Sequence, residues 1–207
     1  MKLFFAMLAL ALLAPVLPAG EPAVTNKPPC CATNAPSTPG AFSATSLYQL
    51  NSTWTTDAGK EMKLGALKGK VQVVAMFFSH CEFTCPLTVN DLRRIEAALP
   101  ESVRGEVGFV LISFDTERDT PEALHAYRTR TGLDSRWTLL RGGADDVQEL
   151  SLLLGVKSKK DARGQFAHSN LITVLNPAGE IVHQLPGINQ DIQSTLSAIT
   201  QAAGARR

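Results

Sequence analysis

Hydrophobic residues in the region 46–207 fall into short apolar runs that alternate with amphipathic segments. Near-continuous apolar runs at 71–78 and 107–114 have the length and character of strands that are covered on both faces. A third, shorter strand is predicted at 137–140. Helices are expected after each strand: Thr120 and Pro121 are typical of a helix start, and Val147, Leu150 and Leu154 lie on one face of the last of these helices. The predicted helices are 87–99, one that begins at Pro121, and 145–154.

A β-hairpin is predicted on each side of this alternating region. The first joins 54–56 to 61–64 through a turn that contains Gly59. The second joins 169–175 to 180–185. The remaining segments are a charged loop at 157–165 and a final helix at 190–203. This order predicts an α/β domain with a central mixed sheet, helices on both faces and an N-terminal β-hairpin extension.

The start of the chain has the pattern of an export signal. One positive charge precedes an apolar run at 3–17, and small residues follow at 18–20. This order is typical of a secretory signal peptide over residues 1–20, which would be a membrane anchor if it were not cleaved. Residues 21–45 are rich in Pro, Ala, Ser and Thr and are expected to be a flexible tether. Residues 46–207 then form one domain, exported to the periplasm or anchored at the outer face of the cytoplasmic membrane.

Charge and cysteine spacing narrow the class of function. The chain has 20 basic and 19 acidic residues, interspersed, so we expect no nucleic-acid surface. Cys30 and Cys31 are adjacent, and Cys81 and Cys85 are four apart, so neither pair closes a loop long enough to stabilise the fold much. The cysteines therefore indicate chemistry. Cys30 and Cys31 either bind metal or exchange with the second pair, or they are exposed thiols without a fixed role.

Cys81 and Cys85 lie between a predicted strand and a predicted helix. Backbone N–H groups and the helix dipole at such a turn favour the thiolate over the thiol. A dithiol after the first central strand, with a hairpin and a helix at the end of the chain, is the arrangement of the thioredoxin-like class. Three intervening residues place both sulfurs on one side of a helical turn, which suits a soft-metal site or a redox disulfide. The alternative is an inert pair of buried or disulfide-bonded sulfurs.

His168 is the candidate third ligand. It lies directly before the predicted strand 169–175, in a loop that faces the dithiol turn in a thioredoxin-like sheet. Such a histidine is ordinarily a surface residue, but beside Cys81 and Cys85 it becomes a metal ligand. Two thiolates and one imidazole suit Cu(I) and also accept Cu(II).

Three other histidines and one charged run are weaker candidates. They are His80, His125 and His183, and the run that contains Asp115, Glu117, Arg118 and Asp119. His80 could tune the pKa of Cys81 or add a ligand, whereas the other two histidines are expected at the surface or in packing. The charged run follows a central strand at the sheet edge that carries the dithiol. One interpretation is that the run begins the next helix, with Asp119 and Thr120 as caps and Arg118 solvated. The other is that it has a functional role, either supporting the site or docking a partner.

Three motifs in this order resemble the SCO/SenC family. They are His80-Cys81-x-x-x-Cys85-Pro86, the run from Ser113 to Pro121, and His168-Ser169 before a strand and an Asn176-Pro177-Ala178-Gly179 turn. The resemblance covers roughly residues 46 to 203. It implies a thioredoxin-like domain that binds copper through Cys81, Cys85 and His168. It further implies delivery of copper to, or reduction of the cysteines of, the CuA centre of cytochrome c oxidase. An oxidase subunit or another exported copper- or thiol-bearing protein is the partner that this resemblance implies.

Two functions of different classes compete for the same sulfurs. A copper metallochaperone needs His168, whereas a thiol–disulfide reductase of exported proteins needs only Cys81 and Cys85, which would cycle through a mixed disulfide. A peroxiredoxin-like peroxidase is a third hypothesis, disfavoured because Glu82 stands where a peroxidatic loop places threonine. We interpret the cysteines first as copper ligands.

Overall fold

The computed structural model describes residues 42–162 and 166–205. The predicted signal peptide, residues 21–41 of the predicted tether, and with them Cys30 and Cys31, lie outside the described residues. Among the helices that the structure describes, none has both the length and the apolar character needed to cross a membrane.

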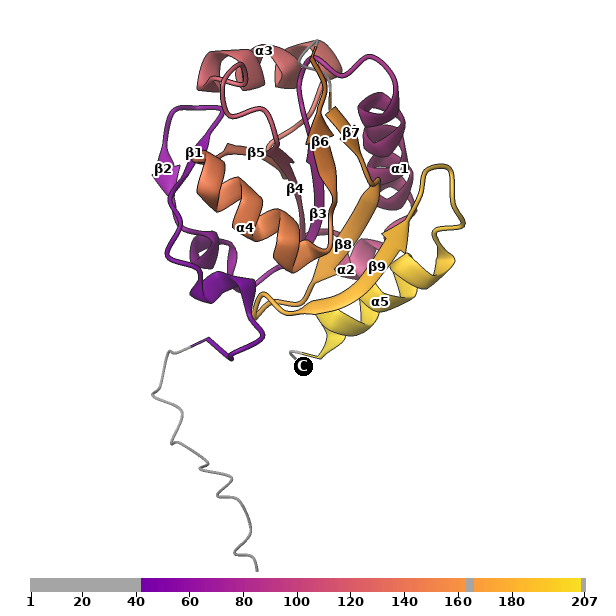
Figure 1. Ribbon diagram of the computed structural model, residues 1–207. Helices are drawn as coiled ribbons and strands as arrows, with labels where there is room; N and C mark the ends of the chain where they lie inside the picture. Colours follow the sequence, from indigo (N-terminus) through magenta and orange to yellow (C-terminus); the bar gives the residue numbers. More distant parts are fainter. Residues whose placement is uncertain (1–41, 163–165, 206–207) are drawn as a thin grey trace, which may run out of the picture. The chain divides into compact units, whose positions relative to one another are not determined.

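A seven-stranded mixed sheet in the order β2-β1-β5-β4-β3-β8-β9 forms the centre of the fold (Figure 1). Its strands are β1 Trp54–Thr56, β2 Glu61–Met62, β3 Val71–Phe77, β4 Val107–Ser113, β5 Trp137–Arg141, β8 Leu171–Leu175 and β9 Ile181–Pro186. β4 runs parallel to both β3 and β5, whereas β8 is antiparallel to β3. Every residue of β3 is buried, as expected of a strand covered on both faces.

Helices pack on both faces of this sheet. They are α1 Thr84–Ala98, α2 Glu101–Arg104, α3 Pro121–Thr131, α4 Ala144–Leu154 and α5 Gln193–Gly204. Met76 of β3 accepts a hydrogen bond from Ser151 of α4. The next residue, Phe77, points to the other face and packs on Tyr127 of α3, with 5.1 Å between the ring centroids. Helices α3 and α4 therefore cover opposite faces, and α1 and α5 contact each other and β3 (Figure 1).

The predicted thioredoxin-like arrangement is confirmed, including its N-terminal extension. The hairpin β1–β2 joins the sheet because β1 also pairs antiparallel with β5. The hairpin β8–β9 and helix α5 complete the domain after the alternating region.

Three details differ from the predicted elements. Helix α1 begins at Thr84, three residues before the predicted start, because a proline in the first helical turn gives up no intrahelical hydrogen bond. The short helix α2 was not predicted. The segment 157–165, expected to be a charged loop, contains β6 Ser158–Lys160, which pairs antiparallel with β7 Phe166–His168.

The folded region begins before residue 46. Phe42 packs edge-on against Tyr48, with 5.7 Å between the ring centroids, and Ser43 donates a hydrogen bond to Glu180. Tyr48 also covers Gly179, which has a φ of +85° and whose hypothetical Cβ would lie 2.4 Å from the tyrosine ring. Both the left-handed conformation and the close approach require glycine there.

Candidate metal centre

Cys81 and Cys85 lie where β3 gives way to α1. Cys81 is in the turn and half-buried, and Cys85 is the second residue of the helix and buried; both thiols are free. The backbone N–H of Cys85 donates to the Sγ of Cys81 over 3.3 Å. The prediction that one helical turn carries both sulfurs is therefore wrong for Cys81, which precedes the helix. Its sulfur contacts the first turn of the helix by accepting the hydrogen bond from Cys85.

His168 is the last residue of β7 and lies against the dithiol. Its Nε2 is 3.6 Å from the Sγ of Cys85 and 3.4 Å from the Oγ1 of Thr84. The two sulfurs and a ring nitrogen of His168 all lie within 4.8 Å of one another. The fold thus brings together the three residues that the sequence singled out, although His168 is more than eighty positions from either cysteine.

The surroundings of His168 set its tautomer and its charge. Its Nδ1 is 3.2 Å from the carbonyl oxygen of Ser169, which can only accept a hydrogen bond, so Nδ1 carries the proton. The unprotonated Nε2 is then the nitrogen that faces the sulfurs. Burial, partly offset by the Ser169 carbonyl, lowers the pKa of His168 and keeps the ring in its neutral, ligating form.

The two thiols differ in acidity. Burial raises the pKa of Cys81, but the backbone N–H groups of Cys85 and Phe83 and contacts with the Cys85 and Thr84 side chains outweigh it, so the pKa lies below the ordinary value. Burial also raises the pKa of Cys85, and the neighbouring Cys81 raises it further, to well above the ordinary range. The expectation that the turn favours both thiolates is therefore wrong for Cys85, because burial outweighs the helix N-terminus.

This difference predicts selective alkylation of the reduced, metal-free protein. Iodoacetamide should modify Cys81 about tenfold or more faster than Cys85, because only a thiolate attacks and Cys81 is also the more exposed. The rate at Cys81 should rise with pH through a midpoint below that of an ordinary thiol. Peptide mass spectrometry over a pH series, in a chain carrying Cys30→Ser and Cys31→Ser, measures both rates. Equal rates at neutral pH would contradict the assignment.

Asp119 holds the turn that carries Cys81. Its carboxylate is fully buried and accepts hydrogen bonds from the backbone N–H of Ser79 at 2.9 Å and from the hydroxyls of Ser79 and Ser113. Because Ser79 lies two residues before Cys81, these bonds fix the path of the chain as it leaves β3. The interpretation of Asp119 as a helix cap is wrong, since Thr120 alone caps α3.

The rest of the charged run is paired as well. Arg118, which was expected to be solvated, donates from its Nε to the buried carboxylate of Asp115. Glu117 pairs with the Nζ of Lys160 over 2.8 Å. Lys160 lies on β6, so this pair connects the run after β4 to the hairpin that carries His168.

The other histidines lie outside the cluster of three ligand atoms. The Nδ1 of His80 is 3.0 Å from the Oγ of Ser79, and its ring is about half exposed. His125 is exposed on α3. The Nε2 of His183 is 3.0 Å from the Oγ1 of Thr195, a packing contact between β9 and α5. The expectation that His125 and His183 are surface or packing residues is confirmed.

Two residues at the site escaped the sequence reasoning. The Oγ1 of Thr84 lies 3.7 Å from the Sγ of Cys81, beside both the dithiol and His168. Phe166 packs on Phe78, with 5.2 Å between the ring centroids, and so anchors β7 to the turn. Both residues could have been found from the sequence. Thr84 lies between the two cysteines, and Phe166 is two residues before His168 and hence on the same face of a strand.

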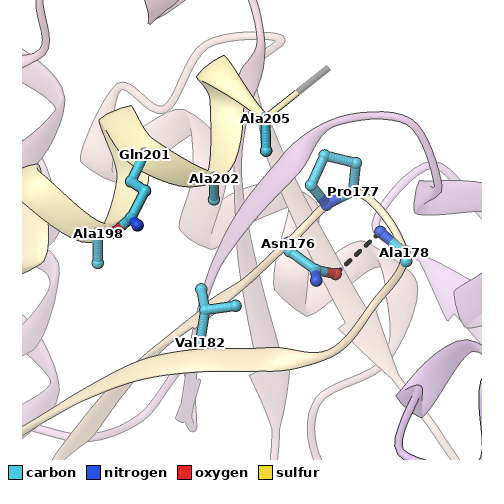
Figure 2. A pocket seen from close by; sticks show the side chains of 8 residues that line it. All are labelled: Asn176, Pro177, Ala178, Val182, Ala198, Gln201, Ala202 and Ala205. Carbon is cyan, nitrogen blue, oxygen red and sulfur yellow. Dashed lines mark hydrogen bonds between the residues drawn. The ribbon is translucent and has the colours of Figure 1, made fainter. Parts of the chain in front are cut away.

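A hollow of about 540 Å³ between α5 and the β8–β9 turn lies away from this centre (Figure 2). Its walls include Pro177, Val182 and Ala202 and contain no titratable side chain. Leu175, just before the turn, pairs with Gln72 near the start of β3, whereas the cysteines follow the end of that strand. The hollow is therefore at the opposite end of the sheet from the chemistry.

Comparison with known proteins identifies the family of this chain. A family model described as SCO1/SenC matches residues 43–204. The chain belongs to the SCO1/SenC family. The resemblance inferred from three sequence motifs is thereby confirmed.

Individual relatives of this SCO1/SenC protein are distant. A protein of Stutzerimonas stutzeri described as a candidate copper-binding protein is 31% identical over 121 residues, which are 56% of this chain and 57% of that protein. A SCO1/SenC family lipoprotein of Bacillus anthracis has a TM-score of 0.67 at 25% identity, over 79% of this chain and 99% of that structure. Copper-bound ScoI of Arabidopsis thaliana has a TM-score of 0.62 at 24% identity, over 72% of this chain and 96% of that structure.

Proposed function

We propose that this SCO1/SenC protein is an exported copper metallochaperone that binds one copper ion through Cys81, Cys85 and His168. The observation that carries the proposal is the convergence of two thiol sulfurs and a ring nitrogen of His168 within 4.8 Å of one another. Thiolates select soft ions such as Cu(I), and the added imidazole also accommodates Cu(II). The copper-bound Arabidopsis structure and the description of the Stutzerimonas relative support the choice of metal.

We propose that the recipient is a respiratory oxidase copper centre, which would receive copper or have its thiols reduced for loading. Family membership supports this role, and it makes an oxidase subunit, or another exported copper- or thiol-bearing protein, the partner. The apolar run at 3–17 and the tether that follows would place the domain outside the cytoplasmic membrane, free or anchored.

Titration with Cu(I) tests the proposal. The reduced full chain with Cys30→Ser and Cys31→Ser should bind one equivalent, and His168→Ala should weaken binding by about tenfold or more, because even outer-shell partners at metal sites contribute that much. His125→Ala, which removes an exposed histidine outside the centre, should leave the affinity unchanged. Failure to bind one equivalent, or a His168→Ala variant with the parent affinity, would overturn the ligand assignment.

A second function, thiol–disulfide reduction, is favoured by the difference between the two thiols. A low-pKa, accessible Cys81 suits the attacking thiolate, and a buried Cys85 beside it suits the resolving thiol. Attack by the Cys81 thiolate on a substrate disulfide breaks the substrate S–S bond, releases one substrate thiolate and forms a mixed disulfide with the other substrate sulfur. Cys85 then displaces the substrate thiol and leaves a Cys81–Cys85 disulfide. Insulin reduction that is lost with Cys81→Ser but retained with His168→Ala would favour this function over metal delivery.

A further inference from the structure

His80 is the one histidine that is next in sequence to a proposed copper ligand and is not itself one of the three proposed ligands. It precedes Cys81 in sequence, and its side chain is 53% exposed. Cys85, in contrast, is 1% exposed, and His168 packs against the rings of Phe78 and Phe114. Cys81, which is half-buried, is therefore the sulfur that an exchanging ligand from solvent meets first, and His80 is its neighbour in sequence.

The hydrogen bonds around His80 determine which of its nitrogens is free. The hydroxyl of Ser79 donates its single proton to the carboxylate of Asp119. The Ser79 Oγ can then only accept from the His80 ring, so the Nδ1, 3.0 Å away, carries the proton. The Nε2 is left with an unshared electron pair, as in the carboxylate–histidine–metal arrangements of metalloproteins, here with a hydroxyl between the carboxylate and the ring.

The far end of this chain of hydrogen bonds is a buried carboxylate with several donors. Asp119 is 0% exposed, and its second oxygen accepts from the backbone N–H of Ser79 and from the hydroxyl of Ser113 on β4. The Oδ1 of Asp119 also lies 3.5 Å from the Nδ1 of His80. The tautomer of an exposed histidine is thus set by a carboxylate that is itself fixed to the central sheet.

We propose that the Nε2 of His80 is a transient copper ligand, through which the ion enters and leaves the Cys81–Cys85–His168 centre. The inference rests on the proposed copper-binding function. In the exchange one bond from copper to Nε2 forms as one bond to an incoming or departing ligand breaks. The oxidation state of copper is unchanged, and in the Nδ1–H tautomer the Nε2 has no proton to give up. A relay ligand of this kind lowers the barrier in both directions and leaves the equilibrium affinity unaltered.

The tautomer can be measured without metal. In the reduced, metal-free full chain at mildly alkaline pH, long-range ¹H–¹⁵N correlation of the imidazole rings should show His80 protonated at Nδ1 and bare at Nε2. Ser79→Ala removes the nearer acceptor for Nδ1–H and leaves only the Oδ1 of Asp119, 3.5 Å away, so it should raise the share of the opposite tautomer of His80. His80 protonated at Nε2 in the parent protein would overturn the inference.

Rates of copper exchange test the relay itself. In the chain with Cys30→Ser and Cys31→Ser, stopped-flow release of Cu(I) to bathocuproine disulfonate and loading from Cu(I)–glutathione should both be about tenfold slower in His80→Gln, at an unchanged dissociation constant. His125→Gln, another exposed histidine beside a buried aspartate, should match the parent.

Two outcomes would overturn the relay. Parent rates in His80→Gln exclude a role in exchange, and weaker affinity with faster release would make His80 a resident ligand. Absence of Cu(I) binding by the parent chain instead contradicts the proposed function, and the equilibrium titration detects that failure before any rate is measured.

Discussion

Replacing Cys85 with serine is expected to weaken Cu(I) binding by more than about a hundredfold, because loss of an outer-shell partner alone costs about 10–100-fold and Cys85 is proposed as a direct ligand. Serine keeps the size of the side chain but offers a hard oxygen that stays protonated. The Sγ of Cys85 lies 3.6 Å from the Nε2 of His168, so its loss removes the soft donor that contacts the imidazole. Competition with a Cu(I) chelator measures the change.

The matched control is the parent chain with Cys30→Ser and Cys31→Ser, which keeps Cys81 and Cys85 and should retain full affinity for one ion. Parent affinity in the Cys85→Ser variant would place copper elsewhere.

The apparent affinity for Cu(I) should also depend on pH, in a direction that the thiol pKa values determine. Burial holds the pKa of Cys85 well above the ordinary range, so binding must expel its proton, and apparent affinity should rise with pH across neutrality.

The grouping of Cys81, Cys85 and His168 could be predicted from local sequence pattern together with the order of strands and helices. An apolar strand followed by a helix fixed the place of the dithiol, and the order of strands and helices brought His168 to the same edge of the sheet. The thiol pKa values could not be predicted in this way. Both cysteines lie at a helix N-terminus, yet only Cys85 is enclosed by core residues from distant parts of the chain.

The hairpin β6–β7 was missed for a physical reason. Its first strand, Ser158–Lys160, contains no apolar residue and its three residues are exposed, so no alternation of apolar and polar residues identifies it. The hairpin is held instead by Phe166 against Phe78 and by the pair between Lys160 and Glu117, which are 43 positions apart. Such contacts become visible only when the fold is known.

The role of Asp119 was left open between a helix cap and support for the site or docking of a partner, and the local pattern could not decide between them. An aspartate just before a threonine and a proline has the pattern of a helix start, and Thr120 does cap α3. The bonds that Asp119 accepts come from Ser113, which is nearby, and from Ser79, which is 40 residues earlier. A local pattern therefore predicted the helix and its Thr120 cap correctly, and was wrong only in adding Asp119 as a second cap.

Substitution of Asp119 by alanine is expected to lower the free energy of unfolding by about 3–5 kcal/mol, a large fraction of the roughly 5–15 kcal/mol that stabilises a domain. The change leaves the Ser79 N–H and two serine hydroxyls buried without their acceptor, and each orphaned group costs about 1–3 kcal/mol. Urea unfolding of the metal-free protein, followed by circular dichroism, measures the loss.

Asp134→Ala is the matched control for this loss. Asp134 also accepts bonds from an arginine and a backbone N–H, but its side chain is half exposed, and water replaces those bonds at a cost below about 1 kcal/mol. Asp119→Asn should fall between the two, because an amide oxygen still accepts while its NH₂ group faces donors. An Asp119→Ala variant as stable as Asp134→Ala would mean that Asp119 does not hold the turn. The fixed Ser79 on which the tautomer of His80 depends would then lose its support.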